Sequence, residues 1–271
     1  MKISMIQMKV QKENDANMQS ACRQIAAAAQ AGADLVLLPE MFCCPYETAN
    51  FPIYAQPQGG TNWNALSACA KENQVYLVAG SMPEREGEAV FNTCYAFDRQ
   101  GKQLAKYRKM HLFDVDIKGG QRFFESETLS AGENLAFFDT EFGRIGLMIC
   151  FDIRFPELAR LLALQGAKAI LVPAAFNMTT GPAHWELHFR SRAVDNQVFL
   201  MGCSPARDPG ASYHAYGHSL AVSPWGEILA ELDEQEGILS CDIDLSKTEE
   251  IREQLPLLKA RRTDVYHISL I

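Results

Sequence analysis

The sequence has no apolar run long enough to cross a membrane. None of its hydrophobic stretches approaches the roughly 18 residues that a spanning helix needs. The first segment, MKISMIQMKV, alternates polar and apolar residues and has no small-residue cleavage site. We therefore expect a first strand rather than a secretory signal. These features predict a cytoplasmic location and no membrane partner.

The sequence also lacks an excess of positive charge. The formal net charge is −8 over 271 residues, and the lysines and arginines are dispersed along the chain. A nucleic-acid-binding protein needs a basic patch or stripe to contact the phosphate backbone. The composition therefore argues against a nucleic-acid partner.

Paired cysteines of the Cys-x-x-Cys type are missing as well. Eight cysteines are scattered through apolar segments, which favours reduced thiols over a disulfide framework and argues against a thiolate zinc site. In HWELH, His184 and His188 share one helical face, but Trp185 stands where the zincin pattern needs glutamate. We therefore expect no metal site.

What the chain does have is an ordinary globular composition, with 48% hydrophobic and 21% charged residues and no Ser/Pro-rich linker. This predicts a single domain over residues 1–271. Periodicity predicts strands at 3–8, 35–38, 75–80, 90–97, 102–107, 145–149, 169–173, 198–203 and near 217–223, 227–232 and 237–243, with helices at 17–30, 65–72, 156–165 and 184–194.

Two segments follow the same plan. GADLVLLPE (32–40) and GAKAILVPA (166–174) each come after a helix and place an apolar run between Gly-Ala and proline. Glycine is the usual residue at the end of a helix, so the likeness alone is weak. Two such half-units give two sheets packed face to face, each covered by helices. We expect an α/β fold of this kind, a four-layer α-β-β-α sandwich.

Three other segments carry local expectations. Residues 111–134 have no sustained period and are predicted to form a long loop with one helical turn, a feature that is usually functional. Ser246 and Glu249 form a capping-box pattern before a last short helix that ends ahead of Pro256. The tail, about 257–271, has an apolar end, so we expect it to pack at a subunit interface.

Three reactive side chains stand at or just after the ends of predicted strands. Glu40 follows 35–38, Lys109 follows 102–107, and Cys150 follows 145–149. Such ends converge on one crevice in α/β sheets. An unassisted thiol is only a few per cent ionised at neutral pH, so a nucleophilic cysteine needs a base and donors for an oxyanion. The three residues together supply these groups.

The segments around these residues resemble a known family. LLPEMF (37–42), YRKMHLF (107–113) and ICFDIRFPE (149–157) are similar to the three signature segments of the nitrilase superfamily, the carbon–nitrogen hydrolases. The resemblance extends over essentially the whole chain, and 175–199, 204–219 and 223–229 look closest to the omega-amidase branch. It implies an α-β-β-α sandwich, a homodimer or higher homo-oligomer and no cofactor.

The resemblance also implies roles for individual residues. It carries a catalytic triad onto Glu40, Lys109 and Cys150 and a second glutamate onto Glu125. Composition alone does not separate Glu125 from Glu127, and the family's FxES context selects Glu125.

In the omega-amidase branch, the substrates are monoamides of 2-oxo dicarboxylic acids, such as 2-oxoglutaramate and 2-oxosuccinamate. They are hydrolysed to the dicarboxylate and ammonia through a cysteine thioester. We expect the Phe151 N–H to help Lys109 hold the oxyanion. Candidate groups for the remaining substrate contacts are Tyr46, Arg154, Thr179, Thr180, Gly181 and His184.

Other functions stay open from the sequence. Within the superfamily, the alternatives are an amidase acting on deaminated glutathione, an N-carbamoyl amide hydrolase and a nitrilase. Outside catalysis, the alternative is an idle family member that binds partners or senses oxidants through its thiol. The complete triad counts against this last interpretation.

Overall fold

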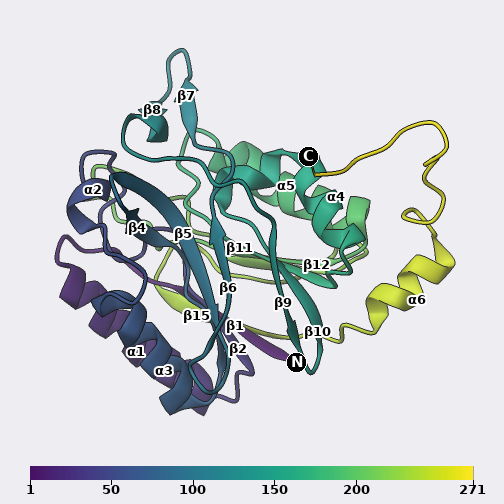
Figure 1. Cartoon of the computed structure of the whole chain (residues 1–271), viewed down its shortest axis with the longest axis horizontal. Coiled ribbons are helices and arrows are strands. Elements are labelled where there is room, and N and C mark those ends of the chain that lie inside the picture. Colours follow the sequence, from purple (N-terminus) through teal and green to yellow (C-terminus); the bar gives the residue numbers. More distant parts are fainter. Residues whose placement is uncertain (271) are drawn as a thin grey trace.

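The computed structural model describes residues 1–270, which form two β-sheets packed face to face between two layers of helices (Figure 1). The first sheet has the order β15-β1-β2-β3-β5-β4, with β6 also paired to β5. Its strands are β1 (Lys2–Gln7), β2 (Leu35–Leu37), β3 (Tyr76–Val78), β4 (Met82–Glu86), β5 (Ala89–Phe97), β6 (Gln103–Arg108) and β15 (Gly237–Asp242).

The second sheet has the order β14-β13-β12-β11-β10-β9. Its strands are β9 (Ala136–Thr140), β10 (Gly143–Leu147), β11 (Ala169–Pro173), β12 (Phe199–Cys203), β13 (Leu220–Val222) and β14 (Ile228–Glu231). In both sheets the central strands are parallel: β1, β2 and β3 in the first, and β10, β11 and β12 in the second.

Helices cover the two outer faces. Figure 1 shows α1 (Asn14–Gln30) and α3 (Thr61–Asn73) on one side, and α4 (Pro156–Leu164) and α5 (Gly181–Asn196) on the other. Helix α5 approaches its sheet closely, because a Cβ atom on Gly202 of β12 would lie 2.4 Å from the Phe189 ring. The small helix α2 (Phe51–Tyr54) and the last helix α6 (Lys247–Gln254) complete the set.

The inner faces of the sheets form one core. Met5 and Leu37 from the first sheet belong to the same apolar cluster as Leu147, Leu171 and Met201 from the second, and all five side chains are fully buried. Each such side chain contributes about 1.5–3 kcal/mol on burial. This packing fixes the two sheets against each other, and with them the strand ends.

The predicted sandwich is confirmed, and the two similar segments occupy matching places in it. Strand β2 lies in the first sheet and β11 in the second, each flanked on both sides by parallel strands. Gly32 and Gly166, which precede these strands, have φ angles of +87° and +91°. Only glycine adopts this left-handed conformation without strain, which explains its presence at both positions.

Several short elements were not predicted. Strands β4 and β9 were missing from the expectation, and the segment 111–134 contains a hairpin of β7 (Asp114–Asp116) and β8 (Arg122–Phe124). The helical turn expected there is confirmed as a 3₁₀ turn, η1 (Glu125–Glu127). Strands β7 and β8 have three residues each and are exposed or half-buried, so they show neither an alternating pattern nor an apolar run.

The capping box at the last helix was a wrong prediction. Ser246 precedes α6, but its side chain makes no capping hydrogen bond. Its hydroxyl instead donates to Asp244 Oδ1 over 2.7 Å. The Ser246 side chain is therefore held toward Asp244, and its oxygen accepts no hydrogen bond from the N–H groups of the first turn.

Within residues 1–270, no helix combines the length and apolar character that a membrane-crossing segment requires.

Candidate active site

The carboxyl ends of β2, β6 and β10 bring the three predicted reactive side chains to one edge of the sandwich. Glu40 lies three residues beyond β2, Lys109 directly follows β6, and Cys150 lies three residues beyond β10. Glu125, in η1, reaches the same place. Glu40, Lys109 and Glu125 are fully buried, and Cys150 is 5% exposed.

Lys109 bridges the two buried glutamates. Its Nζ lies 2.8 Å from Glu40 Oε1, 3.0 Å from Glu125 Oε1 and 2.9 Å from Glu125 Oε2. Burial alone would lower the pKa of Lys109, but the negative charges of Glu125 and Glu40 outweigh it and raise the pKa above its usual value. Lys109 is therefore a permanent cation that compensates two carboxylates.

The two oxygens of Glu40 have different surroundings. Oε1 accepts hydrogen bonds from Lys109 Nζ, from Asn92 Nδ2 over 2.9 Å and from the Tyr46 hydroxyl over 3.2 Å. Oε2 is buried and has no good hydrogen bond from the described residues. Burial raises the pKa of Glu40; Lys109 and the neighbouring thiol of Cys150 lower it, while Glu125 raises it further. One oxygen is thus fixed and the other is free.

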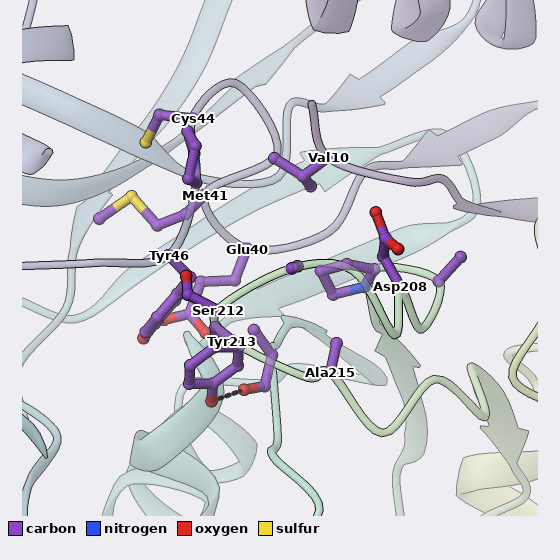
Figure 2. A pocket seen from close by; sticks show the side chains of 14 residues that line it. Val10, Glu40, Met41, Cys44, Tyr46, Asp208, Ser212, Tyr213 and Ala215 are labelled. Atoms are coloured by element: carbon purple, nitrogen blue, oxygen red, sulfur yellow. Dashed lines mark hydrogen bonds between the residues drawn. The ribbon is translucent and has the colours of Figure 1, made fainter. Parts of the chain in front are cut away.

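Glu125 is held on both oxygens. The Phe113 N–H donates to Oε2 over 2.7 Å, and the Tyr46 hydroxyl donates to Oε1 over 2.7 Å. A phenol has one proton, so Tyr46 donates mainly to Glu125, the nearer acceptor. The ring of Tyr46 packs against Tyr213 with 4.6 Å between ring centroids, and Figure 2 shows the two together beside Glu40.

Cys150 stands on a strained turn at the start of η2 (Cys150–Arg154), with a φ angle of +46°. A non-glycine residue in the left-handed region costs about 1–3 kcal/mol. The Asp152 carboxylate holds this turn: Oδ2 accepts from the Ile149 N–H and the Tyr107 hydroxyl, and Oδ1 accepts from the His111 N–H, over 2.7–3.0 Å.

The surroundings of the Cys150 thiol oppose ionisation at rest. Burial raises the pKa of Cys150, and the charge on Glu40 raises it further, while Lys109 and the Ala175 N–H, 3.5 Å from Sγ, act in the other direction. The thiol therefore keeps its proton until a base removes it. Glu40 is the carboxylate that interacts directly with the thiol, so it is the group placed to do so.

Two adjoining recesses reach this cluster. The larger is lined by Glu40, Met41, Tyr46, Asp208 and Tyr213, among other residues (Figure 2). The smaller is lined by Phe113, Cys150, Phe151, Arg154, Ala175, Phe176, Asn177, Thr180 and Tyr213. Tyr213 and Ala175 line both, and the Tyr213 hydroxyl donates to the Ala175 carbonyl.

Only some of the other residues predicted to contact the substrate line the recess beside Cys150. Phe151, Arg154 and Thr180 line the smaller recess beside Cys150. Thr179 lines a more open cavity next to it, and Gly181 packs against Tyr216, where a Cβ would lie 2.4 Å from the ring. His184 Nδ1 faces Arg154 Nη1 at 3.0 Å. In the described part of the chain, no three His, Cys, Asp or Glu side chains gather as metal ligands do.

The sequence analysis missed several residues at the site. Asn92, which donates to Glu40, is a fully buried amide inside the mostly apolar strand β5, and a polar residue in such a run is a usable signal. Phe113 and Tyr213 line the recess from loops and carry no such signal. Asp152, which holds the Cys150 turn, was also not identified.

Comparison with known proteins assigns the family. The model of the carbon-nitrogen hydrolase family matches residues 2–253. The chain belongs to this family. It is therefore a hydrolase that acts on carbon–nitrogen bonds, and the resemblance to the nitrilase superfamily is confirmed.

The chain is similar to named members of the family. It is 49% identical to omega-amidase NIT2-A of Xenopus laevis, over 99% of this chain and 97% of that one. Among solved structures, Nit3 of Saccharomyces cerevisiae, a member of branch 10 of the nitrilase superfamily, matches with a TM-score of 0.89 and 42% identity, covering 97% of this chain and 96% of that one. An amidase from Nesterenkonia sp., with acrylamide added at its active-site cysteine, matches with a TM-score of 0.82 and 26% identity, covering 98% of each chain.

The bridge between the two carboxylates predicts a strong effect of Lys109→Met on stability. The change leaves two buried carboxylates without a cation, and breaking a buried pair in this way typically costs about 3–5 kcal/mol. We expect a loss of this size in the free energy of unfolding, measured by urea denaturation. Lys102→Met, at an exposed position, is the control and should change little. Adding Glu125→Gln to Lys109→Met should recover part of the loss; equal stability of Lys109→Met and wild type would contradict the bridge.

Proposed function

We propose that this chain is an omega-amidase that hydrolyses the terminal amide of 2-oxo dicarboxylic acid monoamides, such as 2-oxoglutaramate and 2-oxosuccinamate, through a thioester on Cys150. The observation that carries the proposal is the free, buried Oε2 of Glu40 beside the Cys150 thiol, with Lys109 next to both. The 49% identity to an omega-amidase over nearly the whole chain supports the substrate class.

The first step forms a tetrahedral intermediate on Cys150. Glu40 Oε2 accepts the proton of the Cys150 thiol as the sulfur attacks the amide carbon. The carbonyl electrons move onto oxygen, which the Phe151 N–H and Lys109 stabilise. An N–H in the first turn of a helix has no partner within that helix, so the Phe151 N–H is available. Lys109 has three N–H donors, and its contacts to two carboxylates leave one for the oxyanion. One such donor is typically worth about 2.7–4 kcal/mol.

The second step releases ammonia and then the acid. Glu40 gives its proton to the amide nitrogen, the oxyanion collapses and the carbon–nitrogen bond breaks, so that ammonia leaves and the acyl group remains as a thioester on Cys150. Glu40 then accepts a proton from water as the oxygen attacks the thioester carbon. Collapse of the second oxyanion breaks the carbon–sulfur bond, and the thiol recovers the proton from Glu40. Glu125 acts throughout as a positioning residue, because it fixes Lys109 without facing the thiol.

The substrate carboxylate is assigned to Arg154 in this proposal. Arg154 and Cys150 line the same small recess, together with Thr180. The guanidinium has no carboxylate within ion-pair distance among residues 1–270, so it is free to bind an anion from outside. A dicarboxylic monoamide with its amide at Cys150 supplies that anion at its other end.

The proposal predicts that Cys150→Ala abolishes ammonia release from 2-oxoglutaramate. Removing a nucleophile that acts as a unit with its base costs at least about a thousandfold in kcat. Cys44→Ala, which changes a buried cysteine of the adjoining recess, should keep most of the activity and serves as the matched control. Turnover by Cys150→Ala at the wild-type rate would refute the mechanism, and wild-type activity on nitriles or N-carbamoyl compounds in place of 2-oxoglutaramate would refute the substrate class.

The contacts of Glu40 predict how activity depends on pH. Glu40 must be ionised to accept the thiol proton, and burial raises its pKa, so the acid limb of kcat/KM should lie above the ordinary glutamate range. Asn92→Leu removes a donor that favours the ionised form, so it should move this limb to higher pH. The measurement is a pH–rate profile with the exposed Asn64→Leu as control. An acid limb that stays in place in Asn92→Leu would exclude Glu40 as the titrating base.

The same proposal includes the location and assembly of the protein. We assign it to the cytoplasm, supported by eight cysteines that are all unpaired. We also propose that residues 1–271 act as one domain in a homodimer, with the tail 257–271 at the subunit interface. Val265, Tyr266 and Leu270 in this tail are 68%, 54% and 50% exposed, which leaves apolar surface for a second copy to cover. Ile271 lies outside the described residues.

The assembly predicts a light-scattering mass of twice the 30.2 kDa of one chain. Val265→Asp combined with Leu270→Asp should shift the protein toward the monomer, because charges are costly in an apolar interface. Ile53→Asp, which changes an even more exposed apolar residue on α2, is the control and should keep the dimer. A monomeric wild type, or a double variant that stays dimeric, would contradict the proposed interface.

A further inference from the structure

Arg154 is a half-buried cation without a protein counterion. Its guanidinium carbon lies 4.8 Å from the ring centroid of Phe176 and 5.7 Å from that of Phe151. Within residues 1–270, no carboxylate pairs with it. Burial lowers the pKa of Arg154, but an arginine stays charged at neutral pH. A cation in this position is available to bind an anion.

Two histidines of α5 hold this guanidinium from one side. His184 Nδ1 lies 3.0 Å and His188 Nε2 lies 3.1 Å from the same atom, Arg154 Nη1. A guanidinium only donates hydrogen bonds, and Nη1 carries two hydrogens. Both ring nitrogens that face it must therefore be unprotonated acceptors. It follows that His184 carries its proton on Nε2, that His188 carries its proton on Nδ1, and that both rings are neutral.

The rest of the local structure keeps His188 neutral and holds α5 against the segment that carries Arg154. Burial, together with Arg154, Arg192 and His184, lowers the pKa of His188 to about 4. Arg192 Nε donates to the Ile153 carbonyl over 2.9 Å, which ties α5 to the segment that carries Arg154. The two rings, one helical turn apart, contact each other edge to face with centroids 5.7 Å apart.

This arrangement leaves one edge of the guanidinium open. Both hydrogens of Nη1 are used by the histidines, and Nε and Nη2 have no hydrogen-bond partner among the described residues. Nε–H and one N–H of Nη2 point in parallel, which is the spacing that a carboxylate binds with two oxygens. An Asp or Glu in place of either histidine would orient Arg154 but also neutralise it. A neutral imidazole orients the guanidinium and leaves its positive charge available to an anion.

We propose that His184 and His188 are positioning residues that set the carboxylate specificity of this enzyme by presenting the Nε/Nη2 edge of Arg154 to the substrate. The proposal rests on the proposed function only for the identity of the substrate. The ligand class, a small molecule with a free carboxylate one short chain away from the amide, follows from Arg154 and Cys150 lining one recess.

Loss of one acceptor should weaken carboxylate binding without impairing the chemistry. In His188→Leu the guanidinium keeps only one of its two histidine acceptors. A hydrogen bond to a charged group typically contributes about tenfold or more to a binding constant. We expect KM for 2-oxoglutaramate to rise by roughly this factor with kcat nearly unchanged. Turnover of pentanamide, a neutral primary amide of the same length, should not change. Arg154→Met should give a larger rise in KM for 2-oxoglutaramate.

Matched variants separate positioning from a general packing effect. His188→Gln keeps an acceptor near the Nε2 position, and His184→Asn keeps one near Nδ1, so both should approach wild-type KM. His188→Leu and His184→Leu should not. Thermal melting of all four variants verifies the fold. Equal loss of activity on both amides in His188→Leu, or no recovery in His188→Gln, would overturn the proposal.

A binding experiment keeps the inference testable apart from catalysis. In the Cys150→Ala background, 2-oxoglutarate is titrated by calorimetry into protein with either His188 or His188→Leu. We expect at least about a tenfold weaker Kd in the latter. An unchanged Kd would overturn the role of the histidines, even if wild type hydrolyses 2-oxoglutaramate. Failure of wild type to release ammonia from 2-oxoglutaramate would instead overturn the proposed function and leave the calorimetric result to decide this inference.

Discussion

The contact of Lys109 with Glu40 and Glu125 is the interaction on which the rest of the site depends. Two carboxylates cannot stay ionised in a buried site unless a cation lies between them, and the three side chains here are fully buried. They come from three separate segments of the chain, so the contact forms only when β2, β6 and η1 are all in place. The sandwich therefore has to hold these segments so that the three side chains lie within hydrogen-bond distance of one another.

The same demand explains the strain at Cys150. Its φ angle of +46° carries a cost that a surface turn would relieve by substituting glycine. Here the Asp152 carboxylate fastens the turn to β6 through Tyr107 and to the following loop through His111, so the conformation is held by its surroundings. The apolar core between the sheets makes this region rigid. The hydrogen bonds of the buried Asp152 carboxylate fix the turn, so the Cys150 thiol is held in one direction.

How much the sequence reveals depends on whether a feature is local. The two Gly-Ala-strand-Pro segments gave weak support for the sandwich, because an apolar run after a helix stop is encoded within ten residues, and the family resemblance implied the same fold. Glu40, Lys109 and Cys150 were found as strand-end residues within recognisable segments. The contacts of Asn92 and of the histidine pair were not predicted, since they join elements far apart in the chain. His184 and His188 were assessed for metal, and their meaning became clear only with Arg154 between them.

The distribution of charge around Cys150 bears on both ends of the proposed reaction. On one side, Glu40 and Glu125 share a single cation and leave the cluster net negative; on the other, Arg154 is a cation with no protein anion. A monoamide is therefore oriented by its carboxylate, because the reversed orientation places that carboxylate against two others. Hydrolysis then creates a second carboxylate where the amide was, beside Glu40. Neighbouring like charges repel strongly in a site that excludes water. The reaction therefore weakens the binding of its own product.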